Sequence, residues 1–343
     1  MSWSKPLPAN PVVAIAGATG AVGREMLLVL EQRAFPAAEV KALASVRSAG
    51  STLPYRGGEL TVEEMCPESF EGVDIALFSA GGTVSEQLRD AVVAAGAVMI
   101  DNSSAFRMAP DVPLVVPEVN PAAAFTHSGV IANPNCSTIQ MVVALNPLHQ
   151  VAPIKRVVVS TYQAASGAGA GGMSELYNQT RDFLADEPLH VEKFAHQIAF
   201  NCIPHIDVFL DDASTKEEWK MVVETKKILG DENIEVAANC VRVPVLRSHA
   251  EMVNVEFAAP ISVEQARAAF AAAPGIIVMD DPATKTYPMP GLLAGTDATY
   301  VGRLRKDPTV AHGLNFWCVA DQIRKGAALN AVQIAELLIG AGR

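Results

Sequence analysis

The sequence predicts an α/β protein with two domains, and three observations lead to this prediction. Short apolar runs rich in β-branched residues alternate with amphipathic segments in the N-terminal part, as in a doubly wound parallel sheet. The first run enters a glycine-rich turn, residues 17–23, just before a helical pattern. The alternation changes near residues 133–136, which marks the expected domain boundary. A chain of 343 residues is long enough for two cores.

The composition excludes several classes of protein. A net charge of -11 argues against binding to nucleic acid or to anionic membranes. No apolar run reaches the ~20 residues that a membrane span needs, and no signal core precedes the first strand. The five cysteines are scattered without a CxxC pair, so neither a disulfide framework nor a metal site is expected. These features favour a soluble, reduced, cytoplasmic protein.

The first predicted strand, Val12–Ala16, leads into the turn Gly17-Ala-Thr-Gly20-Ala-Val-Gly23. A helix follows, with its apolar side chains on one face. Glycines allow the backbone to approach a pyrophosphate closely, and the N-terminus of the helix attracts the anion. The spacing is GxxGxxG rather than GxGxxG, so the alternative is that the glycines serve only a tight turn. We expect a dinucleotide site here.

The loop after the second predicted strand, Val40–Ala44, indicates the type of dinucleotide. A site that prefers NAD usually offers Asp or Glu at this point for the ribose 2′-hydroxyl. This chain offers Arg47 and Ser48 instead. Arginine can bind a 2′-phosphate through two parallel hydrogen bonds, which favours NADP. The alternative is that Arg47 is an ordinary solvated loop residue.

The strand–helix alternation continues to the end of the first domain. Strands are predicted over Val73–Phe78 and Ala97–Ile100, with a helix over Glu86–Ala95 between them. Ligands of doubly wound sheets lie beyond the carboxyl ends of the strands, where the chain has polar loops. Arg107 follows one of these loops and would project into the same crevice, unless it is simply a surface arginine.

The segment Ala132-Asn-Pro-Asn-Cys136-Ser-Thr138 places a thiol at the start of a predicted helix, since apolar residues recur at helical spacing over Thr138–Gln150. The first N–H groups of a helix are unpaired and bear its positive end. A thiol there is expected to lose its proton more easily, and the same N–H groups can stabilise an oxyanion. Cys136 is therefore a candidate nucleophile, the alternative being a small buried residue.

The second half begins with a predicted strand, Val157–Tyr162, that runs into a loop rich in Gly, Ala and Ser over residues 163–169. Such a loop lets a ligand or another backbone come close. A charged helix is predicted over Ser214–Leu229, most of whose side chains should form a solvated face. The last predicted helix is Leu329–Ile339, which can return to the first domain.

Arg242 and His249 lie in the segment CVRVPVLRSHAE. A fully extended chain would place them ~23 Å apart. Pro244 between them favours a bend, which would let both side chains reach one pocket. A lone histidine is more often structural than catalytic. His249 is nevertheless the candidate base, because Cys136 needs one and no other histidine has comparable polar neighbours.

Taken together, these segments resemble aspartate-β-semialdehyde dehydrogenases over nearly the whole chain. The matching motifs, in the order of the family, are GATGAVG, SVRSAG, DNSSAFRM, DVPLVVPEVN, ANPNCST, TYQAASGAG, EEWK, ETKKIL and CVRVPVLRSHAE. The resemblance implies a Rossmann-type dinucleotide-binding domain and an α+β catalytic and dimerisation domain, as in the glyceraldehyde-3-phosphate-dehydrogenase-like fold. It also implies reductive dephosphorylation of L-aspartyl 4-phosphate by NADPH through a cysteine thioester, a step toward lysine, methionine and threonine.

The resemblance also implies a role for each matching residue. Cys136 corresponds to the nucleophile and His249 to the acid/base. Gln163 corresponds to an amide that orients the substrate, Arg242 to the group that binds its α-carboxylate, and Glu217 to the group that faces its ammonium.

The remaining implied roles concern phosphate and cofactor. Arg107 and Lys220 correspond to phosphate-binding cations. The cofactor contacts correspond to Gly17, Thr19, Gly20, Ala21, Val22, Gly23, Arg47, Ser48, Ser166 and Gly167. Glu224 and Lys227 repeat the spacing of Glu217 and Lys220, so either pair could line the site.

The implied domains are 1–135 for NADP binding, completed by a C-terminal helix over 324–343, and 136–323 for catalysis and dimerisation. The family implies a homodimer or homotetramer with an interface built mostly by a sheet. Ala250 stands where many relatives have a serine after the histidine.

Other functions stay open from the sequence. One is another acyl-phosphate or acyl-thioester reductase, such as N-acetylglutamyl-phosphate reductase, in which Glu217 would lack a purpose. A second is a dinucleotide-binding paralogue without activity. A third is a cysteine hydrolase, against which the glycine turn and Arg47 argue.

Overall fold

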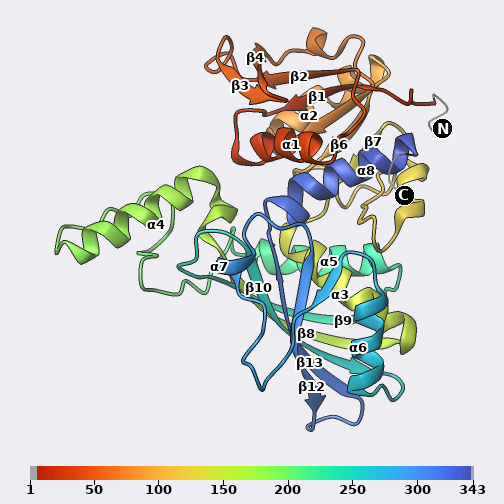
Figure 1. Cartoon of the computed structure of the whole chain (residues 1–343), viewed down its shortest axis with the longest axis vertical. Coiled ribbons are helices and arrows are strands. Elements are labelled where there is room, and N and C mark those ends of the chain that lie inside the picture. The colour runs from red at the N-terminus through yellow and green to blue at the C-terminus, as the bar shows by residue number, and fades with distance from the viewer. Residues whose placement is uncertain (1–5, 341–343) are drawn as a thin grey trace. The chain divides into compact units, whose positions relative to one another are not determined.

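The computed structural model describes residues 6–340, which divide into two compact units. Unit 1 extends to Asn135 and takes up the chain again from Ala327, whereas unit 2 comprises Cys136–Gly326 (Figure 1). The chain therefore leaves unit 1 once and returns to it at its C-terminal end. Within residues 6–340, no helix is both long enough and apolar enough to span a membrane.

Unit 1 is built on a seven-stranded sheet of order β3-β4-β2-β1-β5-β6-β7, in which only β3 pairs antiparallel. Its strands are β1 (Val12–Ala16), β2 (Glu39–Ala44), β3 (Thr52–Tyr55), β4 (Gly58–Glu64), β5 (Ile75–Phe78), β6 (Val98–Asp101) and β7 (Val130–Ala132). The strand order reverses at β1, which has β2 on one side and β5 on the other. Doubly wound sheets bind their ligands at such a switch point.

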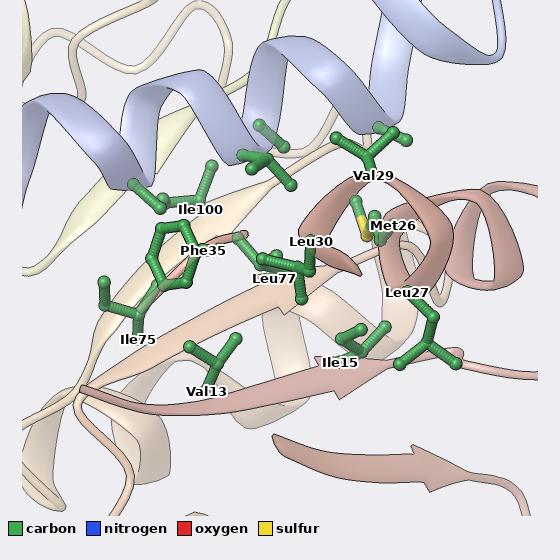
Figure 2. Packing of buried hydrophobic residues seen from close by; sticks show 14 of the residues in the cluster. Val13, Ile15, Met26, Leu27, Val29, Leu30, Phe35, Ile75, Leu77 and Ile100 are labelled. Atoms are coloured by element: carbon green, nitrogen blue, oxygen red, sulfur yellow. The ribbon is translucent and has the colours of Figure 1, made fainter. Parts of the chain in front are cut away.

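The helical elements of unit 1 are α1 (Ala21–Gln32), α2 (Gly82–Ala94), α8 (Leu329–Ile339) and the short 3₁₀ turns η1 (Pro67–Phe70) and η2 (Pro121–Thr126). The core lies between the sheet and the helices α1 and α8. Figure 2 shows Ile15 of β1 and Leu77 of β5 facing Met26 and Leu30 of α1. Burying a side chain of this size contributes about 1.5–3 kcal/mol. Glu336 of α8 is further bonded to Arg33, with both N···O distances 2.7 Å.

The four strands predicted for unit 1 are all present. The helix predicted over residues 86–95 begins four residues earlier, at Gly82. Gly81 takes a φ of 90°, which favours glycine and lets the helix start directly after the loop. The hairpin of β3 and β4 was not predicted. Its turn uses positive φ at Arg56 and Gly57, as two-residue hairpin turns require.

Unit 2 contains a six-stranded sheet of order β11-β12-β13-β10-β8-β9. Its strands are β8 (Ile154–Gln163), β9 (Glu235–Arg242), β10 (His249–Phe257), β11 (Ile276–Val278), β12 (Thr299–Asp307) and β13 (Gly313–Ala320). Its helices are α3 (Cys136–Val151), α4 (Gly169–Leu184), α5 (Lys216–Leu229), α6 (Val263–Ala272) and α7 (Pro290–Leu293), with a 3₁₀ turn η3 (Ala165–Ala168) and a π-helical turn η4 (Arg324–Ala328).

One face of the unit 2 sheet is covered by helices. The helices α3, α5 and α6 pack against it, whereas α4 extends away from the sheet (Figure 1). Along β10 the odd-numbered residues are buried under these helices, and Met252, Asn254 and Glu256 lie half-buried on the other face. The strands β9 to β13 and the helices α4, α6 and α7 were not predicted from the sequence.

Candidate active site

Three of the predicted site residues lie at one edge of the unit 2 sheet. The strands β8 and β9 are parallel and end at the paired residues Gln163 and Arg242. The strand β10 runs antiparallel beside β8 and begins at His249. The C-terminal ends of β8 and β9 and the start of β10 therefore meet at the same edge of the sheet. This pairing brings together Arg242 and His249, which an extended chain would hold far apart.

The connection from β9 to β10 fixes the start of β10. The N–H of Val243 donates to the carbonyl oxygen of Gln163 at 3.0 Å. Ser248, directly before His249, has a φ of 76°, a conformation that is strained for serine. Its N–H donates to Oε1 of Gln322 at 2.8 Å, and Nε2 of Gln322 donates to the hydroxyl of Ser166. Gln322, which the sequence analysis did not single out, thus supports the residue before the candidate base.

Cys136 is the first residue of α3, two residues earlier than the predicted start of the helix. Its side chain is half-buried. No acidic residue lies in the first turn of α3, so the positive end of the helix is not neutralised there. Gly326 lies against Cys136, because a Cβ on Gly326 would come within 2.8 Å of the Cys136 Cβ. Only a residue without a side chain fits at this position.

Arg242 lies near both the thiol and the imidazole. Its Nη1 donates to the carbonyl oxygen of Ala164 at 2.8 Å. Burial lowers the pKa of Arg242, while the negative charges of Glu217 and of a Cys136 thiolate oppose this shift. A Cβ on Gly167 would come 2.5 Å from this Nη1 and 3.4 Å from Cε1 of His249. Gly167, predicted as a cofactor contact, therefore makes room for these two side chains.

Gln163 begins a chain of hydrogen bonds that ends at a cation. Its Nε2 donates to Oγ of Ser137 at 2.7 Å and to Oε1 of Glu217 at 3.0 Å. The other carboxylate oxygen of Glu217 accepts from Nζ of Lys220 at 3.1 Å, and Lys220 also donates to Asp207 at 2.6 Å. Burial alone would lower the pKa of Lys220, but the two carboxylates raise it above its ordinary value.

The two pairs that the sequence left open on α5 differ in their position relative to Gln163. Glu217, which is 5% exposed, contacts Gln163 directly, and Lys220 contacts Glu217. Glu224 and Lys227 lie about two turns further along the helix. Asp207, the second partner of Lys220, lies in an irregular segment whose sequence carries no periodic signal, and the sequence analysis did not find it.

His249 is fully buried and oriented by the backbone. Its Nδ1 accepts a hydrogen bond from the N–H of Ala164 at 3.0 Å. Within residues 6–340, its Nε2 has no hydrogen-bond partner. Burial lowers the pKa of His249 well below its ordinary value, and the charge of Arg242 adds to this effect. Ala250 packs with Leu293 and Val319 on the opposite face of the sheet. The hydroxyl of a serine at this position would therefore lie away from His249.

The glycine turn of unit 1 lies at the carboxyl ends of β1, β2 and β5. Gly17 has a φ of 87°, and both Gly17 and Ala18 donate their N–H to Leu43. A Cβ on Gly23 would come 2.2 Å from the carbonyl oxygen of Gly17. Gly20 is the N-cap residue of α1 and, as a glycine, offers no side chain to bind the first N–H groups of the helix. Thr19, Ala21 and Val22 complete the turn. This cradle fits a phosphate group bound by the first N–H groups of α1.

The other predicted residues of unit 1 differ in exposure. Arg47 is exposed and Ser48 is half-buried, both in the turn after β2. Arg107 is 8% exposed and is held by backbone oxygens. Its Nε donates to Asn133 and its Nη2 to Asn102, both at 3.0 Å. Arg107 therefore belongs to unit 1, whereas Lys220, the other predicted phosphate ligand, belongs to unit 2.

Comparison with known proteins identifies the family. Residues 12–127 match the model of the semialdehyde dehydrogenase NAD binding domain, and residues 145–325 match that of the semialdehyde dehydrogenase dimerisation domain. An aspartate-semialdehyde dehydrogenase of Aquifex aeolicus is 56% identical over 334 residues, which cover 96% of this chain and 98% of that protein. The chain belongs to the aspartate-semialdehyde dehydrogenase family.

Solved structures of the family agree in fold. The crystal structure of aspartate semialdehyde dehydrogenase II of Vibrio cholerae complexed with ASA superposes with a TM-score of 0.93 at 49% identity, covering 96% of this chain and 98% of that one. The Candida albicans enzyme with NADP superposes with a TM-score of 0.73 at 26% identity, covering 96% and 98%. The dinucleotide-binding domain of the family is thus present in this chain.

Proposed function

We propose that this member of the aspartate-semialdehyde dehydrogenase family reduces L-aspartyl 4-phosphate to L-aspartate 4-semialdehyde and phosphate with NADPH. The main support is the chain of contacts from Gln163 through Glu217 to Lys220, with Arg242 beside it. Such a site offers a carboxylate for the substrate ammonium and cations for its carboxylate and phosphate. An N-acetylated substrate has no ammonium for Glu217, so N-acetylglutamyl-phosphate reductase is the less favoured function.

In this proposal the thiolate of Cys136 attacks the carbonyl carbon of the acyl phosphate. The C–O bond to phosphate breaks, and the thioester forms on the sulfur. Arg107 and Lys220 bind the departing phosphate, while Arg242 holds the α-carboxylate and Gln163 orients the carbonyl. When NADPH is bound, it supplies the hydride that reduces the thioester. The C–S bond then breaks, and Cys136 is regenerated.

The preference for NADP is proposed to depend on Arg47 in the turn after β2. Its guanidinium is exposed and would bind the 2′-phosphate, with Ser48 beside it. Arg47→Glu removes a charge-assisted contact worth about 1.5–3 kcal/mol. NADP should therefore bind roughly 10–100-fold more weakly, while binding of NAD changes little. Titration of both dinucleotides against the variant measures this, and equal losses would show that Arg47 does not contact the 2′-phosphate.

The activity itself can be tested in the reverse direction. We expect the chain to reduce NADP in the presence of aspartate semialdehyde, and only when phosphate is added. Cys136→Ala should abolish turnover while leaving NADP binding intact, because the atom that bears the acyl group is missing. Turnover of N-acetylglutamate semialdehyde in preference to aspartate semialdehyde would contradict the proposed substrate.

The chain is proposed to act as a homodimer or homotetramer in the cytoplasm. The face of the unit 2 sheet turned away from α3 carries Tyr162, which is 39% exposed and packs against Trp317 with the ring centroids 5.3 Å apart. Beside them, Met252 and Trp317 line a hollow of about 330 Å³. A second copy of this chain would cover these aromatic and apolar side chains. The match to a dimerisation domain supports this assembly.

A further inference from the structure

We propose that Asp207 competes with phosphate for Lys220, and that it thereby promotes the release of phosphate from the site. This inference rests on the proposed function, in which Lys220 binds the phosphate group. In it, Asp207 does not touch the reacting atoms. It acts through Lys220, and it affects the binding of phosphate alone.

The segment that carries Asp207 is attached to the site at both ends. At one end, Ile203 forms an antiparallel bridge with Arg242, in which both N···O distances are 2.9 Å. At the other end, the N–H of Lys216, the first residue of α5, donates to the carbonyl oxygen of Val208 at 2.8 Å. Asp207 lies between these two attachments, so the backbone holds its side chain against α5.

The carboxylate of Asp207 is directed at Lys220. Its Oδ1 accepts from the N–H of Val208 at 2.9 Å, and its Oδ2 accepts from Nζ of Lys220 at 2.6 Å. An ammonium group has three N–H donors, and Lys220 directs two of them to Asp207 and Glu217. A phosphate that binds this ammonium closely therefore competes with a carboxylate.

Of the two carboxylates, Asp207 is the one that can give way. Glu217 is held on its other oxygen by Nε2 of Gln163 at 3.0 Å, and its side chain is only 7% exposed. The side chain of Asp207 is 31% exposed, so water can replace Lys220 as its hydrogen-bond partner. Phosphate that approaches Lys220 therefore displaces Asp207 and leaves the pair of Glu217 and Lys220 intact.

Asp207 and Lys220 are both charged at neutral pH. Burial would raise the pKa of Asp207, but the hydrogen bond and the charge of Lys220 lower it below its ordinary value. Burial would lower the pKa of Lys220, and the charge of Glu217 is the largest of the effects that raise it. Lys220 is thus expected to keep its charge without Asp207. The negative charge of Asp207 then only opposes that of phosphate.

This competition affects both directions of the proposed reaction. When the acyl phosphate is reduced, the released phosphate remains beside Lys220 until it leaves the site. Asp207 then binds the ammonium again, which weakens the binding of this product. In the reverse direction, phosphate must displace Asp207 before it binds. Its KM is therefore higher than it would be without this carboxylate.

The test is the reverse reaction of Asp207→Asn in the full-length protein, with NADP, aspartate semialdehyde and inorganic phosphate. Asparagine has the same shape, tolerates the φ of 69° at this position and can still accept from Val208, so only the charge is removed. We expect KM for phosphate to fall about 3–10-fold and KM for aspartate semialdehyde to stay within about twofold. Asp207→Glu restores the charge and should return KM for phosphate toward that of the unchanged protein.

Two results for Asp207→Asn would overturn the inference. A higher KM for phosphate would mean that Asp207 holds Lys220 in position for phosphate. An unchanged KM would mean that the pair of Asp207 and Lys220 has no effect on phosphate.

Asp212→Asn is the matched control in the same segment. The carboxylate of Asp212 is exposed and accepts from the N–H and the hydroxyl of Ser214. The substitution removes the same charge from a carboxylate that is bonded to Ser214 instead of Lys220. It should leave KM for phosphate unchanged. A fall equal to that of Asp207→Asn would assign the effect to net charge and overturn the inference.

A binding measurement separates this inference from the proposed function. Phosphorus-31 NMR titration of inorganic phosphate with the NADP-bound protein gives a dissociation constant without turnover. This constant should be about 3–10-fold lower in Asp207→Asn than in the unchanged protein, and an equal or higher value would overturn the inference. A lack of phosphate-dependent turnover of aspartate semialdehyde by the unchanged protein would instead contradict the proposed function.

Discussion

The N–H groups of a guanidinium point in fixed directions. The buried Arg242 already donates one of its N–H groups to the carbonyl oxygen of Ala164. The remaining N–H groups can bind a carboxylate through two parallel hydrogen bonds. Lysine keeps the charge but cannot serve both partners. Arg242→Lys should therefore lower kcat/KM for aspartate semialdehyde roughly 10–100-fold, mainly through a higher KM.

Arg267→Lys is the matched control for this prediction. Arg267 lies on α6, is partly exposed, and also donates to a carboxylate, that of Asp280 at 2.6 Å. Its replacement should leave kcat/KM unchanged. Near-native kinetics in Arg242→Lys would remove Arg242 from contact with the substrate.

Glu251 is a buried acid that the proposed mechanism does not use. It lies two residues after His249, opposite Thr161 of β8 and Cys318 of β13. Among residues 6–340, neither carboxyl oxygen has a hydrogen bond of ordinary geometry, although the amide of Gln140 is close enough to interact. Burial raises the pKa of Glu251 well above its ordinary value of 4.5, although the amide of Gln140 opposes this. The folded protein thus favours the protonated, neutral form of this side chain relative to the unfolded chain.

The raised pKa of Glu251 fixes the direction in which the free energy of unfolding changes with pH. A raised pKa in the folded state stabilises the protein fully below about pH 4.5, and this stabilisation is lost as the pH rises through the folded value. Glu251→Gln keeps the shape but removes the proton. Between pH 4.5 and the raised pKa of Glu251, the free energy of unfolding of the variant relative to that of the unchanged protein should therefore rise by about 1.4 kcal/mol per pH unit.

Urea unfolding at pH 5.5 and pH 7.5 measures the effect. Glu256→Gln on the same strand, half-buried and paired with Lys155, is the control and should show no such trend. The same difference in urea midpoint between Glu251→Gln and the unchanged protein at both pH values would contradict the raised pKa of Glu251.

At the scale of elements, the entry of β1 into α1 depends on the absence of a side chain at Gly23. A Cβ there would lie 2.2 Å from the Gly17 oxygen and 2.7 Å from the Ala18 Cα, and neither backbone atom can rotate away. Gly23→Ala should destabilise unit 1 by about 1–3 kcal/mol and weaken the binding of NADP. Urea unfolding and a dinucleotide titration measure the two effects.

Gly82→Ala is the matched control at the start of α2. The nearest atom to its new methyl group would be the Ala105 Cβ at 3.9 Å, an ordinary contact. Alanine also favours a helix over glycine by about 0.5–1 kcal/mol. Gly82→Ala should be neutral or stabilising, and a similar loss in both variants would mean that the turn at Gly23 has no special geometry.

The two sheets explain why one half of the fold could be predicted from the sequence and the other could not. Buried parallel strands are continuous apolar runs, so β1 and β5 are visible locally. The strand β12 carries Arg303, Arg305 and Lys306, so it shows no simple apolar alternation. In β10, Val253, Val255 and Phe257 do alternate with polar residues, a local signal that the sequence analysis did not use. Their pairing depends on partners far away in the sequence, which no local pattern specifies.

The candidate site likewise contains residues that a local pattern predicts and residues that only the folded chain brings together. The position of Cys136 at a helix start follows from local spacing, and so does the glycine turn. The proximity of Arg242 and His249 depends on β8, β9 and β10 meeting at one edge. Asp207 and Gln322 lie outside any periodic segment, and their contacts with the site arise only from the folded chain.

At the scale of the whole molecule, the assembly should depend on the face of the unit 2 sheet that carries Tyr162, Met252 and Trp317. Met252→Asp places a carboxylate in the hollow beside Trp317, which Arg303 and Arg305 also line. Desolvating this charge and losing the apolar contact of Met252 with a second copy are both costly, so the variant should sediment as a monomer. Ala268→Asp, exposed on α6 and thus on the other side of the sheet, should leave the assembly unchanged. Monomeric sedimentation of the unchanged protein would contradict the proposed interface.

The return of the chain to unit 1 sets an order of events during synthesis. Helix α8 is made after all of unit 2, yet most of its side chains lie in the core formed by the part of unit 1 that precedes Cys136. Until α8 has been made, the nascent first domain exposes the apolar surface that α8 covers, while all of unit 2 has already been synthesised. The N-terminal domain is thus the last to close, and a chain that stops before Leu329 would be prone to aggregate instead of folding into a shorter enzyme.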